Sequence, residues 1–466
     1  MISSNKIIFY GGVGATTGAN IMLQVGGASH RLNILVDCGI LQGVDNASKI
    51  NSEPFAFKPS EVVFLFLTHA HMDHIGRVPK LVRDGFLGQI ISTPETRELA
   101  RPLLEDALKV MQSNDPEHIL YDSNDIAKTF TLWETKKYDE EFKIFEEASA
   151  VFQNAGHILG SAIVNIKIGD KKYAFTGDLG NSPSPLLPDT DLIKKADAIV
   201  MESVYGDRNH EAHEIRDANL LRVLKEGIAR GGAILVPAFS VERTQVLLYE
   251  INNYIEEGKL PSVPVFVDSP LAAKVTDIYK KYSDNFNESV RAEIRAGDDI
   301  FNFPKLEITR SVLDSKSIYN KTGPKIIIAG SGMSEGGRVV SHEANLLPHA
   351  ENTLLLVGYQ SVGTLGRRLE EGEKEVNINH QKIKVRARVE VIKGFSSHKD
   401  SDHLLEFVEK SVYGENWDGK NTAEVKKPKI FVIMGEPKAS LFLAQRIKEY
   451  LDIEAIFPEA GKEYPI

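Results

Sequence analysis

The chain has 466 residues, of which 42% are apolar and 26% charged, and its formal net charge is −10 at pH 7. This length suffices for two or three domains with a large core, and the composition is that of an ordinary globular protein. The acidic balance argues against a generally basic nucleic-acid-binding surface but is compatible with a local basic channel. The single cysteine, Cys38, excludes a disulfide framework, and the sequence shows no secretory leader and no run of about 18 apolar residues. We therefore expect a cytoplasmic protein without a membrane span.

The first 204 residues are predicted to alternate strands, glycine-containing turns and amphipathic helices. The glycine-rich segment 11–19 fits a tight turn between the first two strands, because it lacks the Lys-Ser/Thr ending of a phosphate-binding P-loop. An apolar run at 62–67 predicts a buried strand, and the pattern over 94–113 predicts an amphipathic helix.

Four candidate metal ligands follow the predicted strand at 62–67, in the segment LTHAHMDHIG: His69, His71, Asp73 and His74. In an extended backbone, the first three would project to the same side. Three imidazoles and a carboxylate this close together are unfavourable in a core and well suited to zinc. We therefore predict a metal site where this strand ends.

Three further strand ends carry matching chemistry. His157 lies between glycines in NAGHILGSA, Asp178 follows the strand-like KKYAF, and Asp37 ends the strand-like NILVD. A hydrolytic metal site needs neutral imidazoles, carboxylates and an open position for water. Two metals about 3.5–4 Å apart also need a shared carboxylate, for which Asp178 is the candidate.

Residues 205–385 show a different strand–helix alternation, which predicts a parallel sheet covered by helices. Across the end of this segment, KIKVRARVEVIK (382–393) places four cations at alternate positions of a predicted strand: Lys382, Lys384, Arg386 and Arg388. Such a stripe either holds a phosphate backbone or is a solvated strand face, and the sequence leaves both interpretations open.

With these motifs the chain resembles the metallo-β-lactamase superfamily, whose hallmark is the H-x-H-x-D-H run. Residues 205–385 resemble the β-CASP insert of its nucleic-acid-processing members, the ribonucleases related to the pre-mRNA 3′-end processing endonuclease and its prokaryotic counterparts. The segments that carry this second resemblance are MESVYGDR (201–208), PAFSVERTQ (237–245), VDSPLA (267–272), GSGMSEGGR (330–338), GYQSVGTLGRRL (358–369) and GFSSHKD (394–400). The implied fold is α/β: residues 1–204 and 386–466 form an αββα sandwich, and 205–385 form an inserted α/β β-CASP domain, with the metal site at the cleft.

The resemblance also implies two Zn²⁺ sites, with these ligands: His69, His71, Asp73, His74, His157 and Asp178. The first zinc takes the first two histidines and His157, the second takes Asp73 and His74, and Asp178 bridges them. Asp37 orients the loop by hydrogen bonds and binds no metal directly.

Three other positions are assigned by the resemblance. His398 is implied to contact the scissile phosphate, and Glu202 to hold its tautomer, which makes Asp73, His398 and Glu202 the expected catalytic residues. Where the family places a second-site histidine near its C-terminus, this chain has Met434, a soft and weak ligand for such a site. The second site is therefore expected to be weaker than the first, or to prefer Mn²⁺.

The implied function is a zinc-dependent ribonuclease in which metal-activated hydroxide leaves 5′-phosphate and 3′-hydroxyl ends. The expected substrate-binding residues, in or near the loops of the insert, are Arg243, Ser331, Arg338, Arg367 and Arg368. Three alternatives stay open: a DNA nuclease, a small phosphodiester or ester hydrolase of the same fold, and a non-catalytic RNA-binding homologue. The expected partner is RNA, and a homodimer is also left open.

Overall fold

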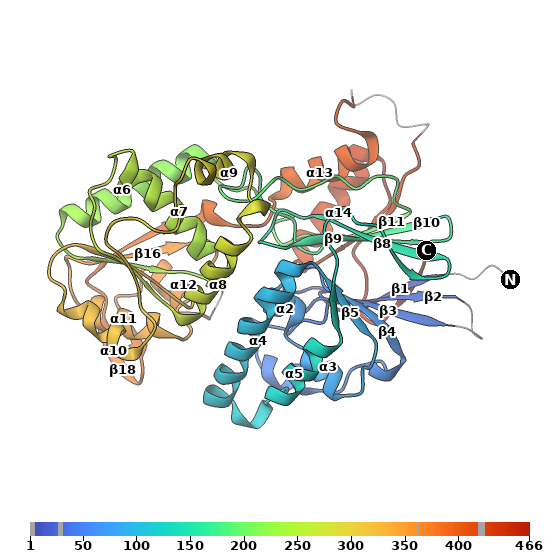
Figure 1. The fold of residues 1–466 in the computed structure, drawn as a ribbon, viewed down its shortest axis with the longest axis horizontal. Helices are drawn as coiled ribbons and strands as arrows, with labels where there is room; N and C mark the ends of the chain where they lie inside the picture. The colour runs from blue at the N-terminus through green and yellow to red at the C-terminus, as the bar shows by residue number, and fades with distance from the viewer. Residues whose placement is uncertain (1–4, 27–30, 362, 418–424) are drawn as a thin grey trace. The chain divides into compact units, whose positions relative to one another are not determined.

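A computed structural model describes residues 5–26, 31–361, 363–417 and 425–466. The chain divides into two compact units, a first formed by residues 1–209 with 397–466 and a second formed by residues 210–396 (Figure 1). Within the described ranges, no helix is both long and apolar enough to cross a membrane.

The first unit contains two seven-stranded sheets, in the orders β22-β1-β2-β3-β4-β5-β6 and β21-β20-β11-β10-β9-β8-β7. The strands of the first sheet are β1 Lys6–Gly11, β2 Asn20–Val25, β3 Leu32–Val36, β4 Val62–Phe66, β5 Gln89–Ser92, β6 Trp133–Thr135 and β22 Glu463–Pro465. Those of the second sheet are β7 Phe142–Phe145, β8 Ala148–Asn154, β9 Ala162–Ile168, β10 Lys171–Phe175, β11 Ala198–Glu202, β20 Lys429–Ile433 and β21 Ala455–Ile456.

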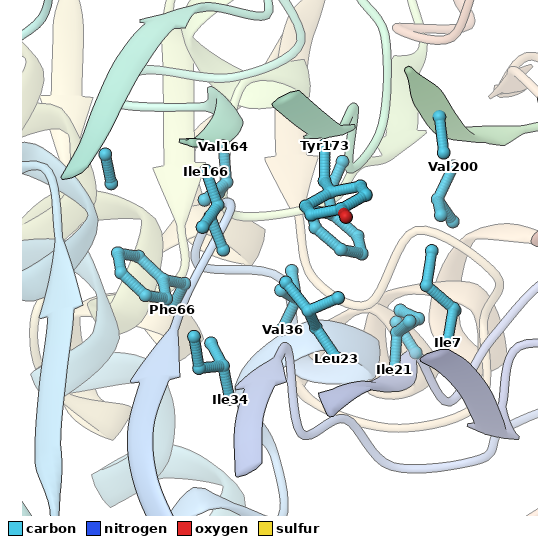
Figure 2. Close-up of a cluster of buried hydrophobic side chains, with 14 of the residues drawn as sticks. Ile7, Ile21, Leu23, Ile34, Val36, Phe66, Val164, Ile166, Tyr173 and Val200 are labelled. Atoms are coloured by element: carbon cyan, nitrogen blue, oxygen red, sulfur yellow. The ribbon is translucent and has the colours of Figure 1, made fainter. Parts of the chain in front are cut away.

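An apolar core joins the two sheets face to face, because alternate residues of each strand point inward. Figure 2 shows part of this core, with side chains of both sheets interdigitated: Ile7, Ile21, Leu23, Ile34, Val36, Phe66, Val164, Ile166, Tyr173 and Val200. These residues are at most 3% exposed. Strands such as β11 and β20 are buried at nearly every position, so they form continuous apolar runs in the sequence.

Helices cover the outer faces of both sheets. Leu404 of α13 (Ser401–Tyr413) and Leu443 of α14 (Pro437–Leu451) pack against Ile199 and Val432 of the second sheet. On the far side of the first sheet lie α3 (Val78–Arg83), α4 (Pro94–Asn114) and α5 (Ser123–Thr131) (Figure 1). The layers are αββα, which confirms the predicted fold class.

The second unit has a six-stranded sheet in the order β14-β13-β15-β12-β16-β19, in which all neighbours are parallel. Its strands are β12 Ala233–Pro237, β13 Val265–Asp268, β14 Leu306–Ile308, β15 Lys325–Ala329, β16 Thr353–Val357 and β19 Arg388–Ile392, and a hairpin is formed by β17 Glu375–Ile378 and β18 Gln381–Lys384. Its helices are α6 His213–Ala229, α7 Arg243–Glu256, α8 Pro270–Lys281, α9 Glu288–Arg295, α10 Val312–Ser317, α11 Arg338–Leu346 and α12 Leu365–Glu370.

The cationic stripe expected on one strand over 382–393 is not formed. β18 ends at Lys384, and the amides of Arg386 and Ala387 donate to the Leu347 carbonyl, which breaks the extended segment before β19 begins. β19 then pairs with β16 in the sheet of the second unit, whereas the predicted boundary places its residues in the C-terminal part of the first domain. Edge pairing of this kind depends on a distant strand and leaves no mark on local periodicity.

The backbone of the histidine-rich segment is braced by the loop after β3. Cys38 N–H donates to the His74 carbonyl at 2.8 Å, and Ile40 N–H donates to the Met72 carbonyl at 3.1 Å. Between them, a Cβ on Gly39 would lie 1.5 Å from the Asp73 carbonyl oxygen. Only glycine permits this approach.

Replacement of Gly39 by alanine should therefore push the two segments apart. We expect Gly39→Ala to lower the free energy of unfolding by about 3 kcal/mol or more, measured by denaturant titration. Gly336→Ala is the matched control, because a Cβ there meets nothing within 4 Å. Equal stability of both variants would contradict the packing described.

Candidate metal centre

Strand ends of both sheets deliver the candidate ligands to one place. His69 and His71 follow β4, His157 lies between β8 and β9, and Asp178 follows β10. Asp73 and His74 lie in the short helix α2 (Met72–Ile75), for which His71 is the N-cap. Asp73 is thus placed by a helical turn, which differs from the extended backbone that we predicted for it.

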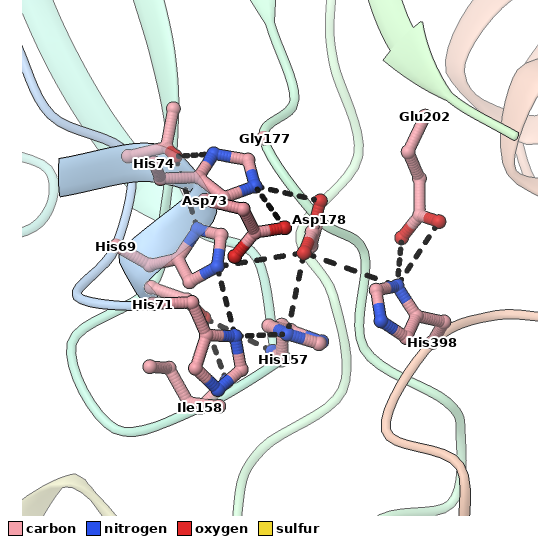
Figure 3. Close-up of polar contacts among 12 residues, drawn as sticks. His69, His71, Asp73, His74, His157, Ile158, Gly177, Asp178, Glu202 and His398 are labelled. Carbon is pink, nitrogen blue, oxygen red and sulfur yellow. Dashed lines mark hydrogen bonds and ion pairs between the residues drawn. The ribbon is translucent and has the colours of Figure 1, made fainter. Parts of the chain in front are cut away.

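Three imidazoles converge beside Asp178 (Figure 3). His71 Nδ1 lies 3.1 Å from His69 Nε2 and 3.2 Å from His157 Nε2. Asp178 Oδ2 lies 3.4 Å from His69 Nε2 and 3.5 Å from His157 Nε2. Nitrogen and carboxylate donors aimed at one point match the ligand preferences of zinc.

The other carboxylate oxygen of Asp178 faces a second set of candidate ligands, which consists of Asp73 and His74. His74 Nε2 lies 3.3 Å from Asp178 Oδ1 and 3.8 Å from Asp73 Oδ2. Within the described part of the chain, His74 Nε2 and Asp178 Oδ1 are buried without a hydrogen-bond partner. Buried polar atoms are rarely left so, and a cation between them would satisfy both. The donor set therefore fits two metals that share Asp178.

Hydrogen bonds on the far side of each ring direct lone pairs into these groups. The Ser397 carbonyl can only accept, so His157 Nδ1 donates to it at 3.1 Å and Nε2 keeps its lone pair. Likewise, His74 Nδ1 donates to Asp37 Oδ2 at 2.7 Å. Thr68 Oγ1 donates to the same oxygen at 2.8 Å and can accept from His69 Nδ1 at 3.1 Å. Metal-binding histidines typically have such a hydrogen bond at the ring nitrogen that does not face the metal.

The pKa values of the candidate ligands are shifted by burial and by neighbouring charges, in different directions. Burial lowers the pKa of His71 and of His157 well below the usual histidine value, and charge on neighbouring imidazoles lowers both pKa values further. Burial would raise the pKa of Asp178, but His74 and then His69 hold it well below the usual aspartate value. Neutral His71 and His157 beside an ionised Asp178 are the form in which these groups bind a metal. At His74, by contrast, Asp178 and Asp37 outweigh burial and raise the pKa well above the usual histidine value, so a metal there would have to displace a proton.

His398 and Glu202 form a pair beside the cluster. Both oxygens of Glu202 lie 3.1 Å from His398 Nδ1, and Asp178 Oδ2 lies 3.9 Å from the same nitrogen. Leu179 N–H donates to Glu202 at 2.6 Å and holds the carboxylate in place. Burial opposes protonation of His398, but Glu202 and Asp178 outweigh it and raise the pKa of His398 to about 9.

Met434 follows β20 as expected, but its thioether packs against a glycine. A Cβ on Gly12 would lie 2.7 Å from Met434 Sδ, and the side chain, 2% exposed, belongs to the core between the sheets. It also lines a small cavity together with Asp37, His74 and Glu202. Met434 therefore lies in the core next to His74, one of the candidate ligands of the second metal.

Most of the predicted substrate-binding side chains make contacts within the second unit. Arg338 is hydrogen-bonded to the buried Asp268 at 2.5 Å, and Ser331 Oγ accepts from Glu335 N–H at 3.1 Å inside its own loop. The Arg243 guanidinium lies 5.8 Å from the ring of Phe395. On the surface, Arg367 pairs with Glu371 and Arg368 with Glu373, both at 2.7 Å.

Sequence reasoning missed the residues that hold the ligands. Thr68 and the Ser397 carbonyl orient His69 and His157 but carry no metal-binding chemistry of their own. Lys399, 6% exposed, donates to Ser182 Oγ at 3.1 Å and ties the loop of His398 to the loop after Asp178. A threonine next to a ligand histidine is a usable signal, whereas a carbonyl contact between distant loops leaves none in the sequence.

Comparison with known proteins agrees with the geometry. Residues 18–226 match the metallo-beta-lactamase superfamily and residues 244–369 match the Beta-Casp domain. Ribonuclease TTHA0252 of Thermus thermophilus is 35% identical over 404 residues, which cover 87% of this chain and 90% of that protein. The RNase J-like protein of Methanocaldococcus jannaschii is 33% identical over 438 residues, 93% of this chain and 94% of that one.

The chain belongs to the metallo-beta-lactamase superfamily and carries a Beta-Casp domain. This confirms the predicted family, one of metal-dependent hydrolases that includes ribonucleases. The transcription termination factor FttA of Methanosarcina mazei is also similar, with 32% identity over 433 residues, 90% of this chain and 66% of that one. A crystal structure of a protein of unknown function from Enterococcus faecalis V583 has the same fold, with a TM-score of 0.56, 13% identity and coverage of 99% and 100%.

The contact between Asp37 and His74 offers a direct test of this β-CASP protein. In Asp37→Asn, the amide that replaces Oδ2 would donate to His74 Nδ1, move the proton to Nε2 and remove the lone pair that faces Asp178. Loss of a hydrogen bond that orients a metal-binding histidine commonly lowers the metal affinity by roughly 10- to 100-fold. We expect a loss of this size for one of two zinc ions in an equilibrium titration.

The matched control is Asp125→Asn, which alters a buried carboxylate in the capping box of α5. It should leave both zinc affinities unchanged. Wild-type binding of two zinc ions by Asp37→Asn would show that Asp37 does not set the tautomer.

Proposed function

We propose that this protein is a zinc-dependent ribonuclease that hydrolyses RNA and leaves 5′-phosphate and 3′-hydroxyl ends. The observation that carries the proposal is the convergence of the five other predicted ligands on the two oxygens of Asp178, close to the pair of His398 and Glu202. The names of two similar proteins, Ribonuclease TTHA0252 and RNase J-like protein, support RNA as the substrate.

The residues would share the metals as follows. His69, His71 and His157 would hold one zinc, His74 and Asp73 the other, and Asp178 both. When bound, the zinc ions would lower the pKa of a water molecule and offset charge on the phosphoryl oxygens. The residues themselves supply neutral nitrogen donors and a buried carboxylate in fixed positions, so little reorganisation is needed during the reaction.

His398 is proposed to move the proton that the reaction requires. Attack of water on phosphorus breaks the bond to the 3′ oxygen, which leaves as a hydroxyl once it gains a proton. Glu202 holds His398 Nδ1, so Nε2 is available to deliver that proton. Against the effect of burial, Glu202 and Asp178 raise the pKa of His398 to about 9, which favours the protonated ring that this role requires.

The second zinc is proposed to be held less tightly than the first. It has one imidazole and two carboxylates, because the position where the family resemblance implies a histidine holds Met434, whose side chain packs in the core. Fewer strong ligands mean weaker binding. We therefore propose incomplete occupancy of this site at limiting zinc, with Mn²⁺ as a substitute.

The first functional test follows the ends of the product. RNA labelled at its 5′ end or internally should yield 5′-phosphate and 3′-hydroxyl ends in the presence of zinc, whereas a matched DNA should be cleaved poorly. Asp73→Ala removes a proposed metal ligand. It should slow cleavage by more than roughly 100-fold, which is the upper cost of losing a residue that only orients a ligand. A 2′,3′-cyclic phosphate product, or unchanged cleavage by Asp73→Ala, would contradict the proposed mechanism.

A second test separates His398 from the ligands. We expect His398→Ala to lower kcat roughly 10²- to 10⁴-fold, the usual contribution of a positioned acid. Its zinc content should stay at the wild-type value, because His398 is not among the proposed ligands. The control is His403→Ala, which removes a partly exposed histidine of α13 that is hydrogen-bonded to Asp400 at 2.7 Å. Loss of zinc from His398→Ala would mean that His398 is a ligand.

A further inference from the structure

The loop that carries His398 contains a buried lysine whose only hydrogen bond among the described residues is to a neutral hydroxyl. Lys399 is 6% exposed, and its ammonium donates to Ser182 Oγ at 3.1 Å. The nearby carboxylates act on this ammonium by charge, without a hydrogen bond to it. Lysine is rarely buried in this way, because the lost hydration has to be offset by a partner.

The charge of Lys399 is costly at this position. Burial lowers the pKa of the ammonium, although the charges of Asp189 and Glu202 act in the opposite direction. A neutral side chain of similar length, such as that of methionine, would fill the same space without this cost. A costly charge directly beside a proposed catalytic residue indicates a role in the site rather than in the stability of the fold.

Lys399 closes a ring of contacts around the shared ligand of the two proposed metals. Ser182 lies four residues after Asp178, and Lys399 directly follows His398. On the opposite side of this ring, His398 Nδ1 lies 3.9 Å from Asp178 Oδ2 (Figure 3). The contact between Lys399 and Ser182 therefore fixes the loop of the proposed proton donor relative to the loop of the shared carboxylate.

The backbones of the two loops are joined at the same place. Lys399 N–H donates to the Leu179 carbonyl at 2.9 Å, and His398 itself lies in a β-bridge between the loops. Asn181 N–H donates to the Ser397 carbonyl, also at 2.9 Å. In extended backbone, adjacent side chains point to opposite sides. The Lys399 side chain therefore lies behind His398, on the side that faces away from the metal ligands.

We propose that Lys399 is a positioning residue for proton transfer by His398: its bond to Ser182 holds the imidazole where Nε2 reaches the leaving oxygen. The proposal rests on the proposed function, in which the bond from phosphorus to the 3′ oxygen breaks and this oxygen takes the proton of Nε2. Lys399 then matters only when the leaving group needs a proton. A residue that merely stabilised the fold or the metals would matter for every substrate.

The test varies the need for a proton. The 3′ oxygen of RNA is a poor leaving group, whereas bis(p-nitrophenyl) phosphate releases p-nitrophenolate, which leaves without protonation. In full-length, zinc-loaded protein, we expect Lys399→Met to lower kcat on RNA by roughly 10- to 100-fold, the usual cost of losing a residue that orients another. KM and zinc content should be unchanged, and kcat on the p-nitrophenyl diester should equal that of the wild type.

A second arm asks whether Lys399 acts through His398. In a protein that already carries His398→Ala, the change Lys399→Met should cause no further loss of kcat on RNA. Ser182→Ala removes the hydrogen-bond acceptor and keeps the ammonium, so its loss of kcat should also be confined to RNA. Combined with Lys399→Met, it should add nothing to the loss.

The matched control is Lys80→Met, which removes another buried lysine of the first unit. Lys80 is 1% exposed and paired with Asp84 at 2.5 Å. This variant should be less stable than the wild type, because Asp84 loses its partner, but its kcat on both substrates should be unchanged.

Wild-type kcat of Lys399→Met on RNA, an equal loss on both substrates, or a further loss in the His398→Ala protein would overturn the proposal. If Lys399→Met does not fold, Ser182→Ala decides by the same criteria.

Failure of the proposed function would look different, because the wild type would then hydrolyse aryl diesters but no RNA. In that case a series of aryl diesters with progressively poorer leaving groups replaces RNA, and Lys399→Met should lose activity only toward the poorer ones. A wild type that hydrolysed no phosphodiester would overturn both proposals.

Discussion

Asp178 carries its carboxylate at the end of β10, where it is 2% exposed and faces four imidazoles. Nitrogens of His69, His74, His157 and His398 lie 3.4, 3.3, 3.5 and 3.9 Å from its oxygens. A buried carboxylate is costly unless positive charge compensates it. The same applies to three imidazole nitrogens close to 3 Å apart, whose lone pairs repel unless a cation lies among them. Metals bound among these donors would remove both costs.

This requirement explains how the first unit is arranged around the site. The sandwich brings strand ends of both sheets to one place, and the loop after β3 then supports the ligands from behind. Asp37 accepts hydrogen bonds from His74 and Thr68, and Gly39 lets the backbone approach Asp73. The apolar core holds these loops rigidly, so the donors are in position before a substrate arrives.

The ligands could be predicted from the sequence because imidazoles and carboxylates at strand ends are rare for any other purpose. The αββα layers could be predicted because the metal-ligand motifs carry the resemblance to the family, and the apolar runs placed several of the strands. Other features depend on distant contacts that local patterns do not encode. The pairing of β19 with β16, the direction of Met434 toward Gly12 and the pairing of Arg338 with Asp268 are of this kind.

The central claim is that Asp178 joins two metal sites into one centre, and a count of bound zinc in variants of this residue tests it most directly. Protein dialysed at limiting free zinc is analysed for metal after removal of the unbound ion. The account predicts that Asp178→Ala loses zinc from both sites, whereas His71→Ala and His74→Ala each lose mainly one. Two tightly bound zinc ions in Asp178→Ala would contradict the account, because the shared carboxylate would then be unnecessary.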